Sequence, residues 1–422
     1  MRRSLFFALL LCACVEPRRP AEFTLKIASG GLLAPLEPRV HESFTVLVKS
    51  LVFEVMLEPK AAGGWRSNLF EQWFRVDGHH LRFQLKRDLR FSDGTVVEQR
   101  DVIHSIAACA LSVRTSDAWI EVDSAPQTVD LEDVLSRCVL FKEQEDHSLG
   151  TGPFHLVQQG RDRLTLERNV PRTGHITRVE VLRYPNPREA FASVLRGETN
   201  ALIMLDPGQR ELLQGVPGLQ ILERPGIHAL TAVFNTHRLT SADRRALAST
   251  LPVVEIARNF GGHCVPVVQP ASRETVLPDG PPLSVVVANA FPGALRAALA
   301  LRRGLGKRAG EVTEVTLPEA HRRFSTDDFD IQLDLFQVWP ERTALSYWHT
   351  GSAVLSTYSN PAVDAALNRG DLLAARAALQ EDPPALTLCQ PARVAALDSR
   401  LKAPQLGLYD TFSSVAEWEV SP

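Results

Sequence analysis

The sequence predicts an α/β protein, because segments with strand and helix patterns alternate along the chain. The stretch 81–91 alternates apolar and polar residues, as a half-buried strand does, and a helix pattern follows it. Further along, an apolar strand at 283–289, a helix at 294–305 and a strand at 312–317 follow one another. The 422 residues are enough for two or three domains with a sizeable core.

The amino-terminal segment MRRSLFFALLLCACVEPRRP has the parts of a secretory signal peptide. A basic head precedes a short apolar run, and the small residue Ala13 stands before Cys14, as in a bacterial lipobox. We therefore expect residues 1–14 to be a lipoprotein signal peptide, with Cys14 carrying the lipid that holds the exported protein at a membrane. An ordinary signal peptide with incidental cysteines is the alternative. Cys12 fits less well, because Leu11 before it is not small.

A strand, a tight turn and a helix are predicted between residues 81 and 110. Asp93 and Gly94 form a turn dipeptide, because glycine tolerates positive φ and aspartate bonds its own backbone. Thr95 and Glu98 fit a capping box, which predicts that the helix begins directly after Thr95. The corner contains no nucleophile and no metal cluster, so we interpret it as a shape-building element. The apolar residues of the helix fall on one face, namely Val102, Ile103, Ile106 and Ala110.

The remainder of the chain continues the alternation. Residues 111–150 are polar and have little periodicity. Short strands are predicted between residues 154 and 181, and a helix that stops at Gly197 follows them. The later elements are a strand at 229–236, a helix over 241–260, a Pro-rich crossing or linker at 265–282, a strand at 329–336 and a helix opened by Asn360 and Pro361.

Four cysteines lie beyond the signal segment: Cys109, Cys138, Cys264 and Cys389. An even set in an oxidising compartment suggests disulfides, and three full pairings are open. No CxxC pair occurs, so no structural zinc site is expected. The formal net charge is −3 and the basic residues are scattered, which gives no footprint for nucleic acid.

The sequence lacks the common catalytic and metal-binding motifs. It has no GxSxG and no HExxH, and RRGLGKRAG lacks the Ser or Thr that follows the lysine of a phosphate loop. We therefore expect no enzyme activity, no cofactor and no metal. For His228, His237 and His349 a surface or hydrogen-bonded role is expected, with a ligand to a chelated metal as the alternative. Trp339 either packs in a core at a strand end or lines a cleft and stacks on a ligand.

Several stretches occur in the order that one protein family shows. They are SLVFEVML, LFEQWFRVDGHHLRFQLKRDLRFSDGTVVEQRDVIHSI, GTGPFHLVQ with LTLERN, VFNT with SADRRALAS, DFDIQLDLFQVW, and YSNPAVDAAL. Together, after a lipobox, they resemble the family 5 extracytoplasmic solute-binding proteins of ABC importers, which include peptide-, nickel- and haem-binding members. The resemblance covers residues 23 to 400.

The resemblance implies an α/β, two-lobed periplasmic-binding-protein fold of type II, cluster C-like, with mixed sheets. Lobe I would comprise residues 15–265, lobe II residues 266–388, and residues 389–422 would return to lobe I. Because residues 111–150 are shorter than the subdomain usual at that place, a reduced extra subdomain is expected there. The lobes, joined by two crossings, would close around a small solute, and the closed form would dock on a permease.

The resemblance also implies a site. The strand that ends in DLF would run toward the inter-lobe cleft, and QVWPE would form the loop at its exit. Trp339 would stack on the solute, Gln337 would offer hydrogen bonds, and Glu341 would be the only nearby charge for a cationic group. Asn235 would approach from the hinge side, and His228 lies in a segment that resembles the cleft edge. The family's peptide binders carry an acid at the position that we align with Trp339, and this chain departs from that pattern.

Two cysteines lie where the resemblance puts the crossings between lobes. Cys264 stands in HCVPVVQP and Cys389 in LTLCQPARV, so adjacent crossings would bring them within disulfide distance. Cys109 with Cys138 is the competing pair.

The sequence therefore predicts a monomeric solute-binding lipoprotein of the cell envelope, on the periplasmic side and lipid-anchored to a membrane. It would capture a small solute, peptide-like or chelate-like, for the permease subunits of an ABC-type importer. The rival hypothesis is a cell-envelope structural or interaction lipoprotein that kept the fold and lost transport. The short 111–150 region and the missing acidic anchor favour that rival.

Overall fold

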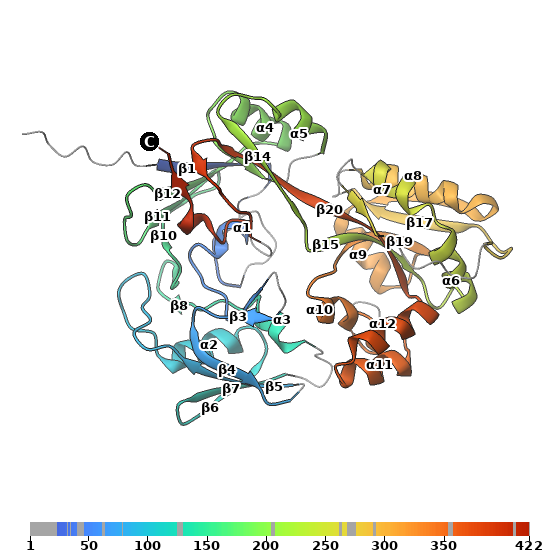
Figure 1. The fold of residues 1–422 in the computed structure, drawn as a ribbon, viewed down its shortest axis with the longest axis horizontal. Coiled ribbons are helices and arrows are strands. Elements are labelled where there is room, and N and C mark those ends of the chain that lie inside the picture. The colour runs from blue at the N-terminus through green and yellow to red at the C-terminus, as the bar shows by residue number, and fades with distance from the viewer. Residues whose placement is uncertain are drawn as a thin grey trace, which may run out of the picture.

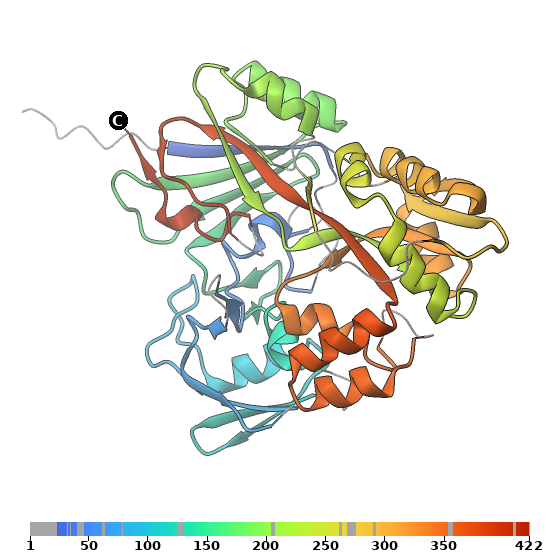
Figure 2. The same ribbon diagram turned by 45° about the vertical axis from the view of Figure 1, so that its right-hand side comes forward.

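The computed structural model has two lobes connected by long strands (Figure 1, Figure 2). Of the 422-residue chain it describes residues 23–31, 33, 35–39, 46–60, 64–77, 79–124, 130–203, 207–260, 264–267, 276–289, 293–352, 358–407 and 411–421. The predicted signal segment, with Cys14, therefore lies outside the described residues.

A twelve-stranded sheet runs through both lobes. Its strand order is β10-β11-β12-β1-β13-β20-β15-β19-β17-β18, and β14 and β16 also pair with β20. The long strand β20 (Ala385–Asp398) passes from one lobe to the other, as Figure 1 shows. Its first half pairs with β15 and β16, and its second half pairs with β13 and β14. The two lobes are thus parts of one continuous sheet, joined where β20 crosses between them.

Lobe I is built on the strands at one end of this sheet. The buried strand β1 lies between β12 and β13 and is parallel to both. The helix α4 begins as its sequence indicates, with Asn186 as cap, and Gly197 after it has a φ of +72°. The elements are β1 (Phe23–Ser29), α1 (Val46–Lys49), β10 (Phe154–Gln159), β11 (Arg163–Arg168), β12 (Ile176–Arg183), α4 (Pro187–Leu195), β13 (Ala201–Ile203), α5 (Pro207–Leu213) and β14 (Leu219–Pro225).

A subdomain of lobe I, residues 56–149, has a hydrophobic core of its own. Its main sheet is antiparallel, in the order β4-β5-β7-β6. The hairpin β6–β7 and the helix α3 arise from residues 111–150, where the sequence showed little periodicity. The elements are β2 (Glu58–Pro59), β3 (Trp65–Arg66), β4 (Phe70–Arg75), β5 (His80–Leu85), α2 (Gln99–Ala107), β6 (Ser112–Ser116), β7 (Trp119–Asp123), α3 (Leu131–Leu135), β8 (Lys142–Glu143) and β9 (Ser148–Leu149).

The predicted helix start at Thr95 is wrong by a turn. The cap of α2 is Glu98, which forms the capping box with Asp101. Thr95 instead donates its hydroxyl to Asp93 within the preceding turn, with Oγ1 and Oδ1 2.6 Å apart. Ala110 lies beyond the end of α2 with a φ of +59°, so it does not continue the apolar face of the helix.

Lobe II has helices on both faces of its part of the sheet. One core packs α6, α7 and α8 against the sheet, and a second core on the opposite face includes side chains of α9 and α12. The elements are β15 (His228–Phe234), α6 (Ser241–Thr250), α7 (Val253–Phe260), β16 (Cys264–Pro266), β17 (Leu283–Ala288), α8 (Ala294–Gly304), η1 (Gly306–Arg308), β18 (Ala309–Val315), α9 (Leu317–Ser325), β19 (Ile331–Gln337), α10 (Glu341–Ser346), α11 (Pro361–Asn368) and α12 (Leu372–Glu381).

The chain enters lobe II earlier than the boundary predicted at residue 265. Strand β14 belongs to lobe I, and β15, which follows it directly, pairs with β19 of lobe II. The single helix predicted over 241–260 is two helices, because Pro252 has no amide hydrogen to continue α6 and Leu251 is extended. After β20 the chain remains in lobe I, with β21 (Leu401–Lys402), η2 (Val415–Glu417) and β22 (Glu419–Val420).

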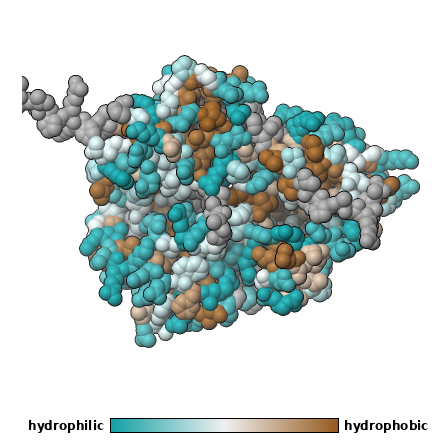
Figure 3. Space-filling model, in the orientation of Figure 1, coloured by the Kyte–Doolittle hydropathy of each residue, from teal (hydrophilic) through white to brown (hydrophobic). Residues whose placement is uncertain are grey.

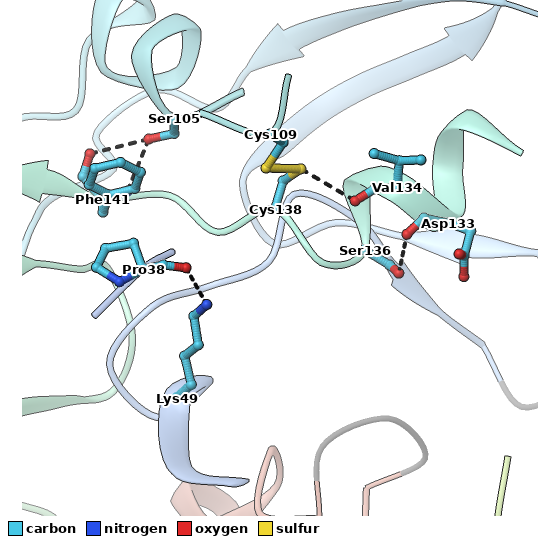
Figure 4. The surroundings of a disulfide bond; sticks show 9 residues. All are labelled: Pro38, Lys49, Ser105, Cys109, Asp133, Val134, Ser136, Cys138 and Phe141. Carbon is cyan, nitrogen blue, oxygen red and sulfur yellow. Dashed lines mark hydrogen bonds between the residues drawn. A yellow bond between two sulfur atoms is a disulfide. The ribbon is translucent and has the colours of Figure 1, made fainter. Parts of the chain in front are cut away.

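Two disulfides are present among the described residues. Cys264 and Cys389 are bonded, as predicted from the resemblance, and their Cα atoms lie 5.4 Å apart. The pair regarded as its competitor, Cys109 and Cys138, is bonded as well (Figure 4). This second disulfide links the segment after α2 to the residues that follow α3.

Hydrophilic side chains cover much of the face seen in Figure 3, and hydrophobic patches are separated from one another on it. None of the helices in the described part of the chain combines the length and the apolar composition that crossing a bilayer requires.

Candidate functional site

The loop after β19 meets lobe I. Gln337 is the last residue of β19, and a cis Trp339–Pro340 peptide bond precedes α10. The Gln337 side chain donates from Nε2 to the backbone oxygen of Trp339 at 2.9 Å and to Oδ1 of Asp133 at 3.2 Å. Asp133 belongs to α3 of the subdomain, so this second bond joins the two lobes. The predicted position of this loop at the boundary between the lobes agrees with the structure.

A second hydrogen bond joins the lobes between α10 and the residue that precedes α3. The hydroxyl of Thr343 in α10 donates to Oδ2 of Asp130, the N-cap of α3, at 2.9 Å. Asp130 and Asp133 are 6% and 2% exposed, and Thr343 is 3% exposed. The start of α3 and the helix α10 therefore form a buried polar contact between the lobes.

Three carboxylates gather on α3, and their environments differ. Glu132 is paired with Arg75, and Asp133 is paired with Arg137. Asp130 has one carboxylate oxygen, Oδ1, that is buried without a hydrogen-bond partner among the described residues.

The titration of Asp130 reflects this buried position. Burial, together with the charges of Glu132 and Asp133, raises its pKa to about 6. The hydroxyl of Thr343 and the charge of Arg342 oppose that rise.

A histidine and two arginines lie near the same loop. His228 stands opposite Gln337 in the pairing of β15 with β19. Burial, followed by the charges of Arg393 and Arg137, lowers the pKa of His228 to about 4. The imidazole is therefore neutral at neutral pH and can offer one donor and one acceptor.

Tyr347 lies at the end of α10. Burial raises the pKa of its phenol to about 12, so the hydroxyl stays protonated at neutral pH.

Trp339 is half-buried. It is absent from the hydrophobic core clusters of the described residues, whereas Trp348 packs into two of them and stacks on Phe336. The two tryptophans therefore differ in environment, although both lie close to α10.

Two predicted site residues have other roles in the structure. The loop after β19 lies at the His228 end of β15, because the two strands are antiparallel and His228 pairs with Gln337. Asn235 follows the last residue of β15 and therefore lies at the opposite end of that strand. Its buried amide donates to the backbone oxygens of Asp327 and Phe329 and accepts from two backbone amides. The structure thus does not bring Asn235 to the hinge side of the site.

Glu341 begins α10 and is paired with Arg376 of α12. It is not the only acid near the loop, because Asp130 and Asp133 approach from lobe I. Sequence reasoning missed these acids. The available signal was the acid-rich run DLEDV in a region without periodicity.

Among the described residues, no three His, Cys, Asp or Glu side chains are grouped closely enough to hold a metal ion. The residues gathered at the exit of β19 are half-buried aromatic groups, a neutral imidazole, and amide and hydroxyl donors of lobe II, facing buried carboxylates of lobe I.

Comparison with known proteins places this fold in a defined structural class. No family model matches the sequence, and no curated protein matches it. Solved structures do match: a putative peptide binding protein AppA from Clostridium difficile has a TM-score of 0.77 at 14% identity, covering 94% of this chain and 100% of that one. The substrate binding protein CtaP from Listeria monocytogenes has a TM-score of 0.76 at 16% identity, covering 95% and 100%.

A further match is NikA from Staphylococcus aureus, solved in complex with Ni(L-His)2. Its TM-score is 0.73 at 12% identity, with 94% of this chain and 100% of that chain covered. The fold of the present chain is thus the mixed α/β periplasmic-binding-protein fold of cluster C, as predicted. The identities are low, and the similarity concerns the fold.

Proposed function

We propose that this protein is an extracytoplasmic solute-binding lipoprotein that captures a small solute between its lobes and delivers it to an ABC-type importer. The observation that carries the proposal is the contact at the exit of β19, where Gln337 and Thr343 of lobe II bond Asp133 and Asp130 of lobe I beside Trp339. A solute held from both sides stabilises only the closed state, which couples closure to occupancy.

In this proposal the protein is a monomer and not an enzyme. Its partners are the solute, the ABC permease subunits and a membrane reached through the lipid anchor. A peptide-like or chelate-like solute is proposed, because the proteins of similar fold include one described as peptide binding and one solved with a nickel–histidine complex. The mixed polar and aromatic character of the site is compatible with both kinds of solute.

Identification of the bound solute tests this function. The protein is purified from its native envelope, denatured and extracted, and the extract is analysed by mass spectrometry. We expect one class of small solute to co-purify, and its return to the emptied protein to reduce the radius of gyration in small-angle scattering. An empty protein that no member of a peptide and metal-chelate library compacts would contradict the proposal.

The second candidate is a structural or interaction lipoprotein of the cell envelope that lost transport. It is favoured by Trp339 at the position where the family's peptide binders carry an acid. Genes for a permease and an ATPase beside this gene would support transport, and their absence together with an empty cleft would support the second candidate.

Lipidation of Cys14 is expected from the lipobox. Cells that express the full chain should incorporate a labelled fatty acid into the wild type and not into the Cys14→Ser variant. The wild type should also sediment with membranes, and the variant should appear in the soluble envelope fraction. Equal labelling of both proteins would show that the segment is an ordinary signal peptide.

The stability of the folded protein is expected to depend on pH through Asp130. Its pKa is about 6 in the folded protein, against 3.8 for the solvated carboxyl of the unfolded chain. Because the folded form has the higher pKa, ionisation of Asp130 opposes folding. The penalty, roughly 1–3 kcal/mol, is present in full above pH 6, decreases between pH 6 and 4, and vanishes below pH 4. The contribution of this residue to the free energy of unfolding should therefore become more favourable when the pH is lowered from 7.5 to 5.

Urea denaturation followed by circular dichroism measures this effect. Asp130→Asn should be more stable than the wild type at pH 7.5, and the difference in the free energy of unfolding should shrink as the pH is lowered to 5. Asp146→Asn, which alters an exposed aspartate in the same subdomain, is the matched control and should behave like the wild type. An unchanged pH profile in Asp130→Asn would contradict the assignment.

A further inference from the structure

A cavity lies in lobe I, away from the contact between the lobes. Its volume is about 500 Å³, which suits a small organic molecule. The lining residues come from three segments, 50–68, 136–153 and 413–417, and all of them belong to lobe I. The cavity therefore lies where the subdomain, the main part of lobe I and the carboxyl-terminal segment meet.

Glu54 is the principal charged group of this cavity. Its carboxylate accepts a hydrogen bond from the hydroxyl of Thr151, with Oγ1 and Oε2 2.8 Å apart, and another from the Asn68 side chain. Burial is the main cause that raises the pKa of Glu54, while its two hydrogen bonds and the charge of Lys86 oppose the rise and the charge of Glu58 adds to it. A carboxylate held in place by two neutral donors and poorly hydrated gains more from a cationic partner than an exposed one does.

No basic residue of the described lining forms an ion pair with Glu54, and the cation that acts on it, Lys86, lies outside that lining. Arg66 is the only basic residue in the described lining, and it is paired with Glu58 at 2.7 Å. The third acid, Glu417, lies at an exposed position and approaches Arg172 at 3.6 Å. Carboxylates thus outnumber guanidinium groups in the wall, which favours a positively charged occupant.

We propose that this cavity of lobe I binds a small organic cation, an amine whose ammonium group pairs with Glu54. The apolar side chains of Val55, Leu57 and Pro153 supply the surface against which its carbon skeleton packs. An organic cation suits the wall better than a metal ion, since the described carboxylates do not converge in a group of three. The site is independent of the solute proposed between the lobes.

The test uses amines with neutral counterparts of equal size. The probes are 1,4-diaminobutane, glucosamine and choline, paired with 1,4-butanediol, glucose and 3,3-dimethylbutanol, and binding to the full protein is measured by titration calorimetry. At least one amine should bind about tenfold or more tightly than its counterpart. Glu54→Gln, which keeps an acceptor for Thr151, should reduce that affinity by about tenfold or more. Glu71→Gln, an exposed glutamate of the same subdomain, is the control for lost charge.

Two further observations decide the outcome. Amide signals of Thr151 and Ala416 in the nuclear magnetic resonance spectrum should shift with the amine in the wild type, and a native circular dichroism spectrum should show that Glu54→Gln is folded. The proposal is overturned if no amine binds in a Glu54-dependent way. It is also overturned if Trp339→Ala abolishes amine binding and Glu54→Gln does not, because the amine would then occupy the site between the lobes.

Discussion

Replacing Cys264 and Cys389 together by alanine is expected to lower the free energy of unfolding by about 4–5 kcal/mol. The two residues are 125 positions apart in the sequence, so their bond removes the closure entropy of a long loop from the unfolded chain. Both cysteines lie in the core cluster of lobe II, one on β16 and one on β20. The loss should therefore appear as destabilisation of lobe II in urea denaturation followed by circular dichroism.

The other disulfide provides the matched control. Cys109 and Cys138 are 29 positions apart, so loop closure predicts a smaller loss, about 3.5 kcal/mol, when both are alanine. Solute binding should instead be weakened more by the loss of the Cys109–Cys138 bond than by the loss of the Cys264–Cys389 bond. The residues before Cys138 form α3, and Asp133 of this helix, drawn in Figure 4, contacts lobe II, whereas Cys264 and Cys389 both lie in the core of lobe II. A larger loss of stability for the shorter loop would contradict the entropic argument.

The sequence was informative where local chemistry decides the structure. Asn360 and Pro361 begin α11 as predicted, because an amide cap and a proline at the first position need no tertiary partner. The alternation in FDIQLDLF likewise places β19 correctly. The break between α6 and α7 was missed although Pro252 signals it, because the apolar periodicity continues across the proline.

The site was less predictable, because it depends on which elements meet. Asp130 and Asp133 lie more than 200 residues from Thr343 and Gln337 in the sequence, and only the packing of the start of α3 against α10 and the end of β19 brings them together. Asn235 illustrates the opposite error. A polar residue at a strand end suggests a binding role, but the antiparallel pairing of β15 with β19 takes it to the far side of lobe II, where backbone groups occupy its amide.

Replacing Trp339 by alanine is expected to weaken binding of the solute that co-purifies with the protein by roughly tenfold to over a hundredfold. Loss of a stacking aromatic at a binding site typically costs on the order of 1–3 kcal/mol or more. If Trp339 serves to stack on the solute, the melting temperature of the unliganded protein should change little in the alanine variant. Titration calorimetry with the identified solute and a thermal melt without it measure the two effects separately.

Trp348→Ala is the matched control, because it removes a tryptophan that packs against the protein itself. Trp348 lies nine residues away, is half-buried like Trp339, stacks on Phe336 and packs against two cores of lobe II, so its loss should cost more stability than the loss of Trp339. The affinity of the folded Trp348→Ala protein should stay close to that of the wild type. If Trp339→Ala instead lowers the melting temperature strongly and leaves the affinity unchanged, Trp339 is a packing residue, and the solute is held by the hydrogen-bonding groups of the two lobes without it.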